Sequence, residues 1–261
     1  MTLSWCDTHC HFDFPAFQER ERHWPFVQKQ GVAALIIPGV NAELGAQLSH
    51  LCQDKPWYYA QGLHPCFINQ HQNKDLDWLE VQLRTDHKII AVGEVGLDKI
   101  MVKQANELEN QWHYFEQQVQ LAKAYRKPLI LHVRGLHDEM CSYLRRNQFD
   151  LGGIVHAFSG SQQQAKAWLQ LGFHLGIGGA MTHSRAQKLR QTVKSIPHQH
   201  WLLETDSPDM KSAFWGAEHH SPAAIPLLAA CLAALQGCTL ETIAFSQKAQ
   251  IQALFPQIVP Y

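Results

Sequence analysis

Eight short apolar segments, each followed by a turn and a more polar stretch, recur along this 261-residue chain. The segments are expected to be strands, and they lie at 3–6, 32–37, 57–60, 89–92, 129–134, 154–156, 173–176 and 201–206. The segment 32–37 is continuously apolar, which is typical of a strand that is covered on both faces. Amphipathic patterns predict helices at 17–30, 42–53, 76–85, 106–125 and 163–171, and two more after Ala223.

Strands that alternate with helices imply a parallel sheet, and eight such units close into a (β/α)8 TIM barrel. The length of the chain suits one barrel, and no linker or charge block divides it. Residues 1–261 are therefore expected to form a single domain. The segment 173–176 is the faintest strand, because glycines surround it. The segment 209–220 has no periodicity and is expected to be a long loop over the barrel mouth.

The composition indicates the cellular compartment of the chain and the kinds of partner that it can bind. Hydrophobic residues make up 46% of the sequence, which is enough to bury a substantial core. The formal net charge of −1 gives no electrostatic footprint of a tight, sequence-blind nucleic-acid binder. Seven cysteines without a Cys-x-x-Cys spacing are typical of a reducing compartment. With no signal-peptide pattern and no apolar run of about 18 residues, we expect a cytoplasmic protein without membrane association. No obligate protein partner is evident.

Metal-binding side chains follow most of the predicted strands. They are His9 and His11 after the first, His64 after the third, Glu94 after the fourth, His132 on the fifth, His156 on the sixth and Asp206 on the eighth. Each histidine alone would more readily be a structural residue. Parallel barrels, however, build their active sites at the carboxyl ends of the strands, so these side chains would converge on one mouth. The sequence therefore predicts a metal site there.

Chemistry suggests a role for each member of this set. His9, His11 and Glu94 would hold one divalent ion, and His132 and His156 a second, with Glu94 able to bridge both. Asp206 would be a ligand and also the base that orients or deprotonates a metal-activated water, so Asp206 and Glu94 are the predicted catalytic residues. Two ions about 3.5–4 Å apart stabilise the attacking and leaving oxygens of a phosphodiester. Imidazole ligands suit zinc, whereas carboxylates also admit magnesium or manganese.

Six motifs around these residues, from Asp7 to Pro208, resemble the ordered signatures of the TatD-like metal-dependent hydrolases. They read Asp-Thr-His-Cys-His-Phe-Asp, Gly-Leu-His-Pro, Gly-Glu-Val-Gly-Leu-Asp, Leu-His-Val-Arg, His-Ala-Phe-Ser-Gly and Glu-Thr-Asp-Ser-Pro. The resemblance implies a (β/α)8 barrel of the amidohydrolase superfamily and metal ligands at His9, His11, Glu94, His132, His156 and Asp206. It also implies a deoxyribonuclease of the 3′–5′ exonuclease type that prefers single-stranded DNA, with His64 and Arg134 as substrate contacts near the scissile phosphate.

The chain departs from the family pattern at positions that are expected to line the mouth. These are Lys99, Ala157 and the segment 209–222. They affect the expected substrate more than the expected reaction. One alternative is therefore a metal-dependent hydrolase of a small-molecule ester, amide or phosphoester. A modified lysine bridges the metals of many such relatives, and Glu94 at the corresponding strand favours the phosphodiesterase. An alternative of another class is a metal-binding protein without catalysis.

Other residues near the predicted mouth carry weaker signals. Trp24, Phe67, Phe214 and Trp215 are placed either to stack on bases or to pack loops onto the barrel. His219 and His220 are expected to be solvent-exposed, and Cys10 is expected to point away from the two neighbouring histidines. The glycines at 93, 96, 176, 178 and 179 match no phosphate-binding loop and are expected in turns.

Overall fold

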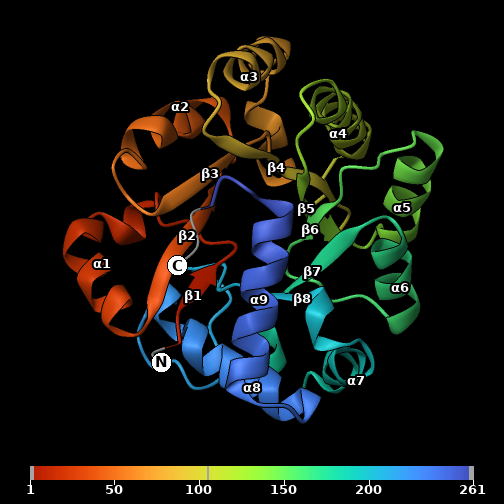
Figure 1. Ribbon diagram of the computed structural model, residues 1–261. Helices are drawn as coiled ribbons and strands as arrows, with labels where there is room; N and C mark the ends of the chain where they lie inside the picture. Colours follow the sequence, from red (N-terminus) through yellow and green to blue (C-terminus); the bar gives the residue numbers. More distant parts are fainter. Residues whose placement is uncertain (1–2, 105, 259–261) are drawn as a thin grey trace.

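A computed structural model describes residues 3–104 and 106–258, and its centre is a barrel of parallel strands (Figure 1). The eight strands pair in chain order as a single sheet. They are β1 (Trp5–Asp7), β2 (Val32–Pro38), β3 (Trp57–Gln61), β4 (Ile89–Asp98), β5 (Leu129–Arg134), β6 (Gly153–Val155), β7 (Phe173–Ile177) and β8 (Trp201–Leu203). All seven pairs of neighbouring strands are parallel. The predicted TIM-barrel fold is therefore confirmed, including the faint seventh strand.

The ends of the sheet meet through contacts between β1 and β8. The Thr8 amide donates to the Leu203 carbonyl (3.1 Å), and the Asp206 amide donates to the His9 carbonyl (2.9 Å). The buried Asp7 carboxylate accepts hydrogen bonds from the amide and the hydroxyl of Thr205. These bonds fix the first and last strands to each other directly beside His9 and Asp206.

Helices surround the barrel, and seven of them lie where the amphipathic patterns predict. The helices at 137–146 and 187–195 were not assigned from the sequence. The nine α-helices are α1 (Arg20–Lys29), α2 (Ala42–Leu51), α3 (Asn73–Thr85), α4 (Glu107–Ala124), α5 (His137–Arg146), α6 (Gln162–Gln170), α7 (Gln187–Ser195), α8 (Ile225–Gln236) and α9 (Leu240–Leu254), counted over the described ranges. Five short 3₁₀ helices are η1 (Pro15–Phe17), η2 (Pro65–Gln70), η3 (Gly179–Thr182), η4 (His198–His200) and η5 (Pro222–Ala224). The segment between β8 and η5 is a long loop, as expected.

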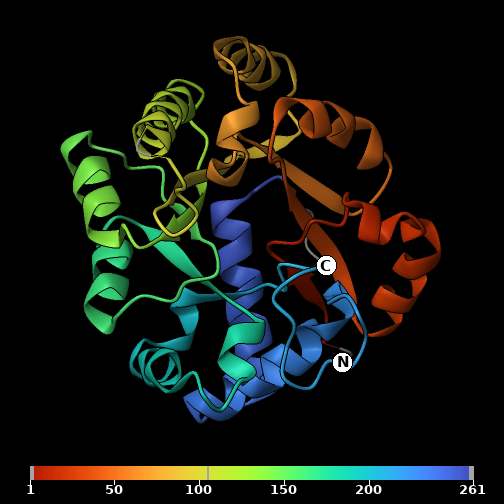
Figure 2. The ribbon, with the colours of Figure 1, turned by 180° about the vertical axis from the view of Figure 1, so that it is seen from behind.

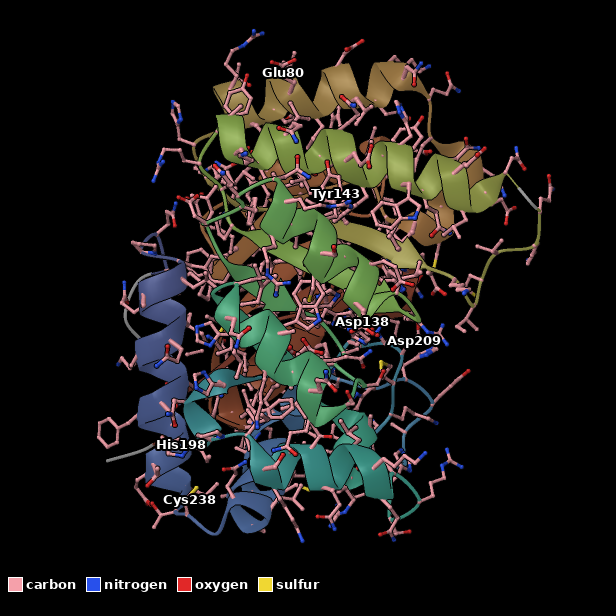
Figure 3. The ribbon with its side chains drawn as sticks, turned by 90° about the vertical axis from the view of Figure 1, so that its right-hand side faces the viewer. Glu80, Asp138, Tyr143, His198, Asp209 and Cys238 are labelled. Atoms are coloured by element: carbon pink, nitrogen blue, oxygen red, sulfur yellow. The ribbon has the colours of Figure 1, made fainter. Side chains whose placement is uncertain are left out.

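Helix α9 closes the end of the barrel at which the strands begin. It crosses that end in Figure 1, and Figure 2 shows the barrel from the opposite side. Apolar side chains of α9 and the segment after it pack on inward-facing strand residues, which include Cys6, Ile36, Ile130, Ile154 and Leu202. In Figure 3, Asp138 and Asp209 lie at the end of the barrel away from α9. The carboxyl ends of the strands are therefore left for a functional site.

The glycines that were expected in turns lie in part within strands. Gly93 and Gly96 belong to β4, and Gly176 belongs to β7. A Cβ atom on Gly176 would lie 2.2 Å from Oε2 of Glu204, which directly follows the adjacent strand β8, so no other residue leaves room for that carboxylate. The sequence prediction was wrong because space for a neighbouring side chain, rather than a turn, requires glycine here.

No single helix in the described ranges is long and apolar enough to cross a membrane, although η5–α8 and α9 would pass by length and composition as a pair bent by 109°. All seven cysteines lie within those ranges, and none of them forms a disulfide.

Candidate metal centre

The predicted site residues lie at the barrel mouth and point into the barrel. The same inward face of each strand carries apolar core residues nearer to the start of the strand. Ile130 and His132 are two residues apart on β5, and Ile154 and His156 stand in the same relation at β6. Because side chains alternate along a strand, the apolar residue fills the barrel and the polar residue two positions later lies above it. His9 is fully buried and Glu94 is 1% exposed, so the set forms a largely dry cluster.

His9 and His11 reach the mouth from a turn rather than from a strand. Strand β1 ends at Asp7, so alternation along a strand is not what brings the two rings together. The rings meet edge to face, with centroids 5.2 Å apart. Cys10 between them points into the core and directs its thiol at the Ile36 carbonyl, as expected. The two imidazoles therefore face one site, as expected, although a turn rather than the alternation of side chains along a strand brings them together.

Four side chains, which we call the His9 cluster, place two carboxylate oxygens within 3.6 Å of two imidazole nitrogens: His9, His11, Glu94 and Asp206. Nε2 of His9 lies 3.1 Å from Oε2 of Glu94 and 3.6 Å from Oδ1 of Asp206. Nε2 of His11 lies 3.6 Å from each of the same two oxygens. Ligands of a tetrahedral ion with bonds of about 2.0–2.1 Å are about 3.3–3.4 Å apart. The spacing of the His9 cluster therefore fits a divalent cation.

Buried polar atoms without hydrogen bonds support the same fit. Nε2 of His9 and Oε2 of Glu94 face each other at 3.1 Å, but within the described part of the chain neither forms a hydrogen bond of good geometry. Burying such atoms without a partner costs free energy, so unpaired atoms that converge on one point are expected only where something binds. The residues present therefore suit a metal ion.

A second group of ligand atoms, the His64 cluster, surrounds the other oxygen of Glu94 and comprises His64, Cys66, His132 and Glu94. Oε1 of Glu94 lies 3.0 Å from both Nε2 of His64 and Nδ1 of His132, and those two nitrogens are 3.2 Å apart. The two carboxylate oxygens of Glu94 thus face different clusters, as a bridging ligand requires.

His156 lies closer to the His9 cluster than to His132. Its ring stacks on that of His9 at a centroid distance of 3.5 Å, and its Nε2 lies 3.6 Å from Oδ2 of Asp206. The rings of His132 and His156 are 6.4 Å apart. That these two residues share one ion stays a prediction.

Two buried carboxylates that were not predicted as site residues hold the histidines in place. Oδ2 of Asp98 lies 2.9 Å from Nε2 of His132. Oε1 of Glu204 lies 3.1 Å from Nδ1 of His156 and accepts a hydrogen bond from the Ala157 amide at 2.6 Å. Metal-binding histidines commonly have such a carboxylate behind them. The sequence carried a signal, since Glu204 is two residues before Asp206 and Asp98 ends the Gly-Leu-Asp motif.

The electrostatics of the cluster favour ionised carboxylates. Burial alone would raise the pKa of Glu94, but His64, His9 and His156 hold it well below its usual value. Burial opposes ionisation of Asp206 as well, yet His156 and its other imidazole neighbours lower its pKa to about 2. Burial lowers the pKa of His64 to about 4, so this imidazole is neutral at pH 7. Neutral imidazoles and ionised carboxylates are the forms that bind metal ions.

A cavity of about 400 Å³ opens beside the cluster and could receive a substrate. It is lined by His132, Val133, Arg134, His156, Ala157, Ser159, Ala180, Asp206 and Met210. The Arg134 side chain is half exposed, and its guanidinium lies 3.4 Å from Oδ2 of Asp98. Arg134 therefore stands beside the cluster, where it was expected, whereas His64 contacts Glu94 directly within it.

The long loop between β8 and η5 contains one wrong prediction. His220 is fully buried, although it was expected to be exposed. Its Nε2 lies 2.9 Å from the Ser212 hydroxyl and its Nδ1 lies 3.1 Å from the Thr205 carbonyl, so it fixes the loop beside Asp206. His219 is exposed, as expected.

The aromatic residues near the mouth divide between the two expected roles. Trp24 is buried against Phe12 and Trp57, so it packs α1 onto the barrel. Phe214 is 46% exposed and remains available for stacking.

Comparisons with known proteins agree with this architecture. The family model of the TatD-related DNases matches residues 6–256. An uncharacterized metal-dependent hydrolase from Escherichia coli K12, YjjV, is 40% identical over 213 residues, which are 80% of this chain and 82% of the relative. The crystal structure of the TatD homologue YjjV from the same organism superposes with a TM-score of 0.92 at 36% identity, covering 98% of this chain and 99% of that one.

A more distant relative has a more specific name. A 3′-5′ ssDNA/RNA exonuclease TatD from Erwinia billingiae is 30% identical over 234 residues, which are 86% of this chain and 88% of the relative. The match of the family model over nearly the whole chain, together with the barrel and its ligand clusters, shows that the chain belongs to the TatD-related DNase family and is a metal-dependent hydrolase.

Proposed function

We propose that this hydrolase cleaves phosphodiester bonds of DNA, removing nucleotides from the 3′ end of a single strand, with two divalent ions in the mouth. The observation that carries the proposal is the position of Glu94, whose two oxygens face the His9 cluster and the His64 cluster. A carboxylate shared between adjacent ions is a feature of two-metal phosphoryl chemistry. The name of the Erwinia relative supports DNA or RNA as the substrate. We further propose zinc as the bound ion, with magnesium or manganese able to replace it.

The protein side chains would position the substrate and move one proton. Arg134 projects from β5 beside the cavity, where its guanidinium would bind the oxygens of the scissile phosphate. Asp206 is ionised, 16% exposed and aimed at the same space, so it would accept a proton from the water that attacks phosphorus. The water oxygen bonds to phosphorus, the phosphorus–oxygen ester bond breaks, and the leaving oxygen takes up the proton that Asp206 accepted. When bound, the ions would polarise the phosphate and lower the pKa of water.

An end-labelled single-stranded oligonucleotide tests this proposal. Metal-stripped protein receives zinc, manganese or magnesium one at a time, and stepwise shortening is followed on a gel. Asp206→Asn should lower the rate about 10²–10⁴-fold, which is the usual contribution of a positioned base. Asp138→Asn, an exposed carboxylate at the same end of the barrel, is the control and should keep the rate (Figure 3). Turnover by Asp206→Asn close to that of the unaltered protein would contradict the assigned role.

A small-molecule phosphoester is the second candidate substrate. Among the described residues that line the cavity, Arg134 is the one permanently cationic side chain, and the net charge of the chain is −1. Such a cavity offers little attraction to a long polyanion. Metal-dependent hydrolysis of a nitrophenyl phosphate ester, with no shortening of the oligonucleotide under any ion, would favour this candidate and refute the DNase.

A further inference from the structure

Cys66 places a thiol beside the second group of ligand atoms. It follows β3 and lies in η2, two residues after His64. Nδ1 of His64 accepts a hydrogen bond from the Cys66 amide (3.0 Å), which directs the other ring nitrogen, Nε2, toward Glu94 and His132. The turn that orients His64 therefore also carries the cysteine to the same side of the mouth.

The distances group the thiol with the two imidazoles. Ligand atoms of His64, Cys66 and His132 all lie within 4.8 Å of one another. Ligands of one tetrahedral zinc ion, a thiolate and an imidazole, are about 3.5 Å apart, so a modest contraction would complete the site. Oε1 of Glu94, 3.0 Å from both imidazole nitrogens, would be the fourth ligand atom. A thiol turned toward these three atoms would complete a set of two nitrogens, one oxygen and one sulfur.

The thiol is accessible and held by a weak contact. Cys66 is the exposed cysteine of the seven, all of which lie in the described ranges, and its Sγ lies 3.8 Å from Oδ2 of Asp98. The Asp98 carboxylate already contacts Nε2 of His132 and the Arg134 guanidinium, so it does not need the thiol as a hydrogen-bond donor. Rotation of the Cys66 side chain toward the imidazoles would therefore cost little.

We infer that Cys66 is a ligand of the ion bound in the His64 cluster, and that it makes this site select soft, thiophilic cations such as zinc or cadmium over magnesium. Soft thiolate ligands favour such ions, whereas magnesium requires oxygen ligands. The inference rests on the proposed function only in requiring that a cation occupies the mouth. It adds a ligand and a basis for metal selectivity to the six ligands predicted from the sequence.

Thiolate ligation has a spectroscopic signature that does not depend on turnover. Cobalt(II) added to the stripped protein should produce a near-ultraviolet thiolate-to-metal charge-transfer band as the sites fill. Cys66→Ser should remove this band and weaken cadmium binding at least 10-fold, while the magnesium affinity stays the same. Cys231→Ser, which alters a half-buried cysteine on α8, is the matched control and should retain the band.

The outcomes separate this inference from the proposed function. A cobalt complex of the unaltered protein without the band, or a band that survives Cys66→Ser, would overturn the assignment of Cys66. An equal loss of magnesium and cadmium affinity in Cys66→Ser would overturn the claim of selectivity. Failure to shorten DNA, with the band present and dependent on Cys66, would refute the proposed substrate and leave the ligand in place.

Discussion

Glu204 illustrates how a residue that touches no substrate can control the site. Its buried carboxylate lies behind His156 and accepts a hydrogen bond from the Ala157 amide. Gly176, which has no side chain, leaves the space that this carboxylate occupies. Burial alone would lower the pKa of His156, but Glu204, Asp206 and Glu94 raise it well above its usual value. A negative charge behind an imidazole also makes it a stronger ligand.

Glu204→Gln should weaken metal binding about 10–100-fold, because the amide can still accept the Ala157 hydrogen bond but no longer carries the charge. Calorimetric titration of the stripped protein with zinc measures the change. Glu107→Gln is the control, since Glu107 is also buried but accepts its hydrogen bonds from the Lys103 amide and Asn69. Equal zinc affinities of Glu204→Gln and the unaltered protein would show that Glu204 has no role in the site.

Single residues were predictable where a strand pattern fixed their position. Glu94, His132 and His156 could be placed at the mouth because each follows an apolar run in register with the barrel interior. His220 could not, since its burial depends on Ser212 and the Thr205 carbonyl, which the loop brings to it without any periodicity. Cys66 was missed as a neighbour of the site because its position depends on the turn that caps η2.

A contact between two helices of the outer layer makes the stability of the folded protein depend on pH. His137, the first residue of α5, accepts a hydrogen bond at Nδ1 from the Trp168 indole of α6 (3.1 Å). Burial lowers the pKa of His137 to about 4. The folded state therefore holds a neutral imidazole, whereas the unfolded chain takes up a proton near pH 6.5. The stabilisation is complete above pH 6.5 and is lost as the pH falls toward 4.

His137→Asn should reduce this pH dependence, because the amide oxygen can accept the indole hydrogen bond but does not titrate. Between pH 7 and 4.5 the unaltered protein should lose about 2 kcal/mol more unfolding free energy than the variant. Urea unfolding of metal-free protein at several pH values measures the difference. If the unfolding free energies of the two proteins changed equally with pH, His137 would titrate alike in the folded and unfolded states.

At the scale of elements, the alternation of strands and helices was enough to predict the barrel, because hydrophobic periodicity records which face is buried. The boundaries were less accurate at β1, which was expected at 3–6 and runs from Trp5 to Asp7. The Asp7 carboxylate at the end of β1 is bonded to Thr205 across the closing seam, and this contact is invisible in the local sequence.

At the scale of the whole molecule, the barrel divides its two ends between stability and chemistry. Helix α9 and apolar residues such as Phe255 fill the end where the strands begin. The other end collects two carboxylates and five imidazoles from strands that are far apart in the sequence but parallel in space. Because the ligand atoms lie on or directly after six different strands, the site exists only when the barrel is closed.

The number of metal ions bound per chain tests the central claim most directly. Stripped protein is reloaded with zinc, freed of excess ion by gel filtration and analysed for zinc by mass spectrometry. The unaltered protein and Glu107→Gln should hold two ions per chain. Glu94→Gln should lose retention of both, because Oε2 faces the His9 cluster and Oε1 the His64 cluster. One ion in the unaltered protein, or two retained by Glu94→Gln, would contradict a two-metal site organised by Glu94.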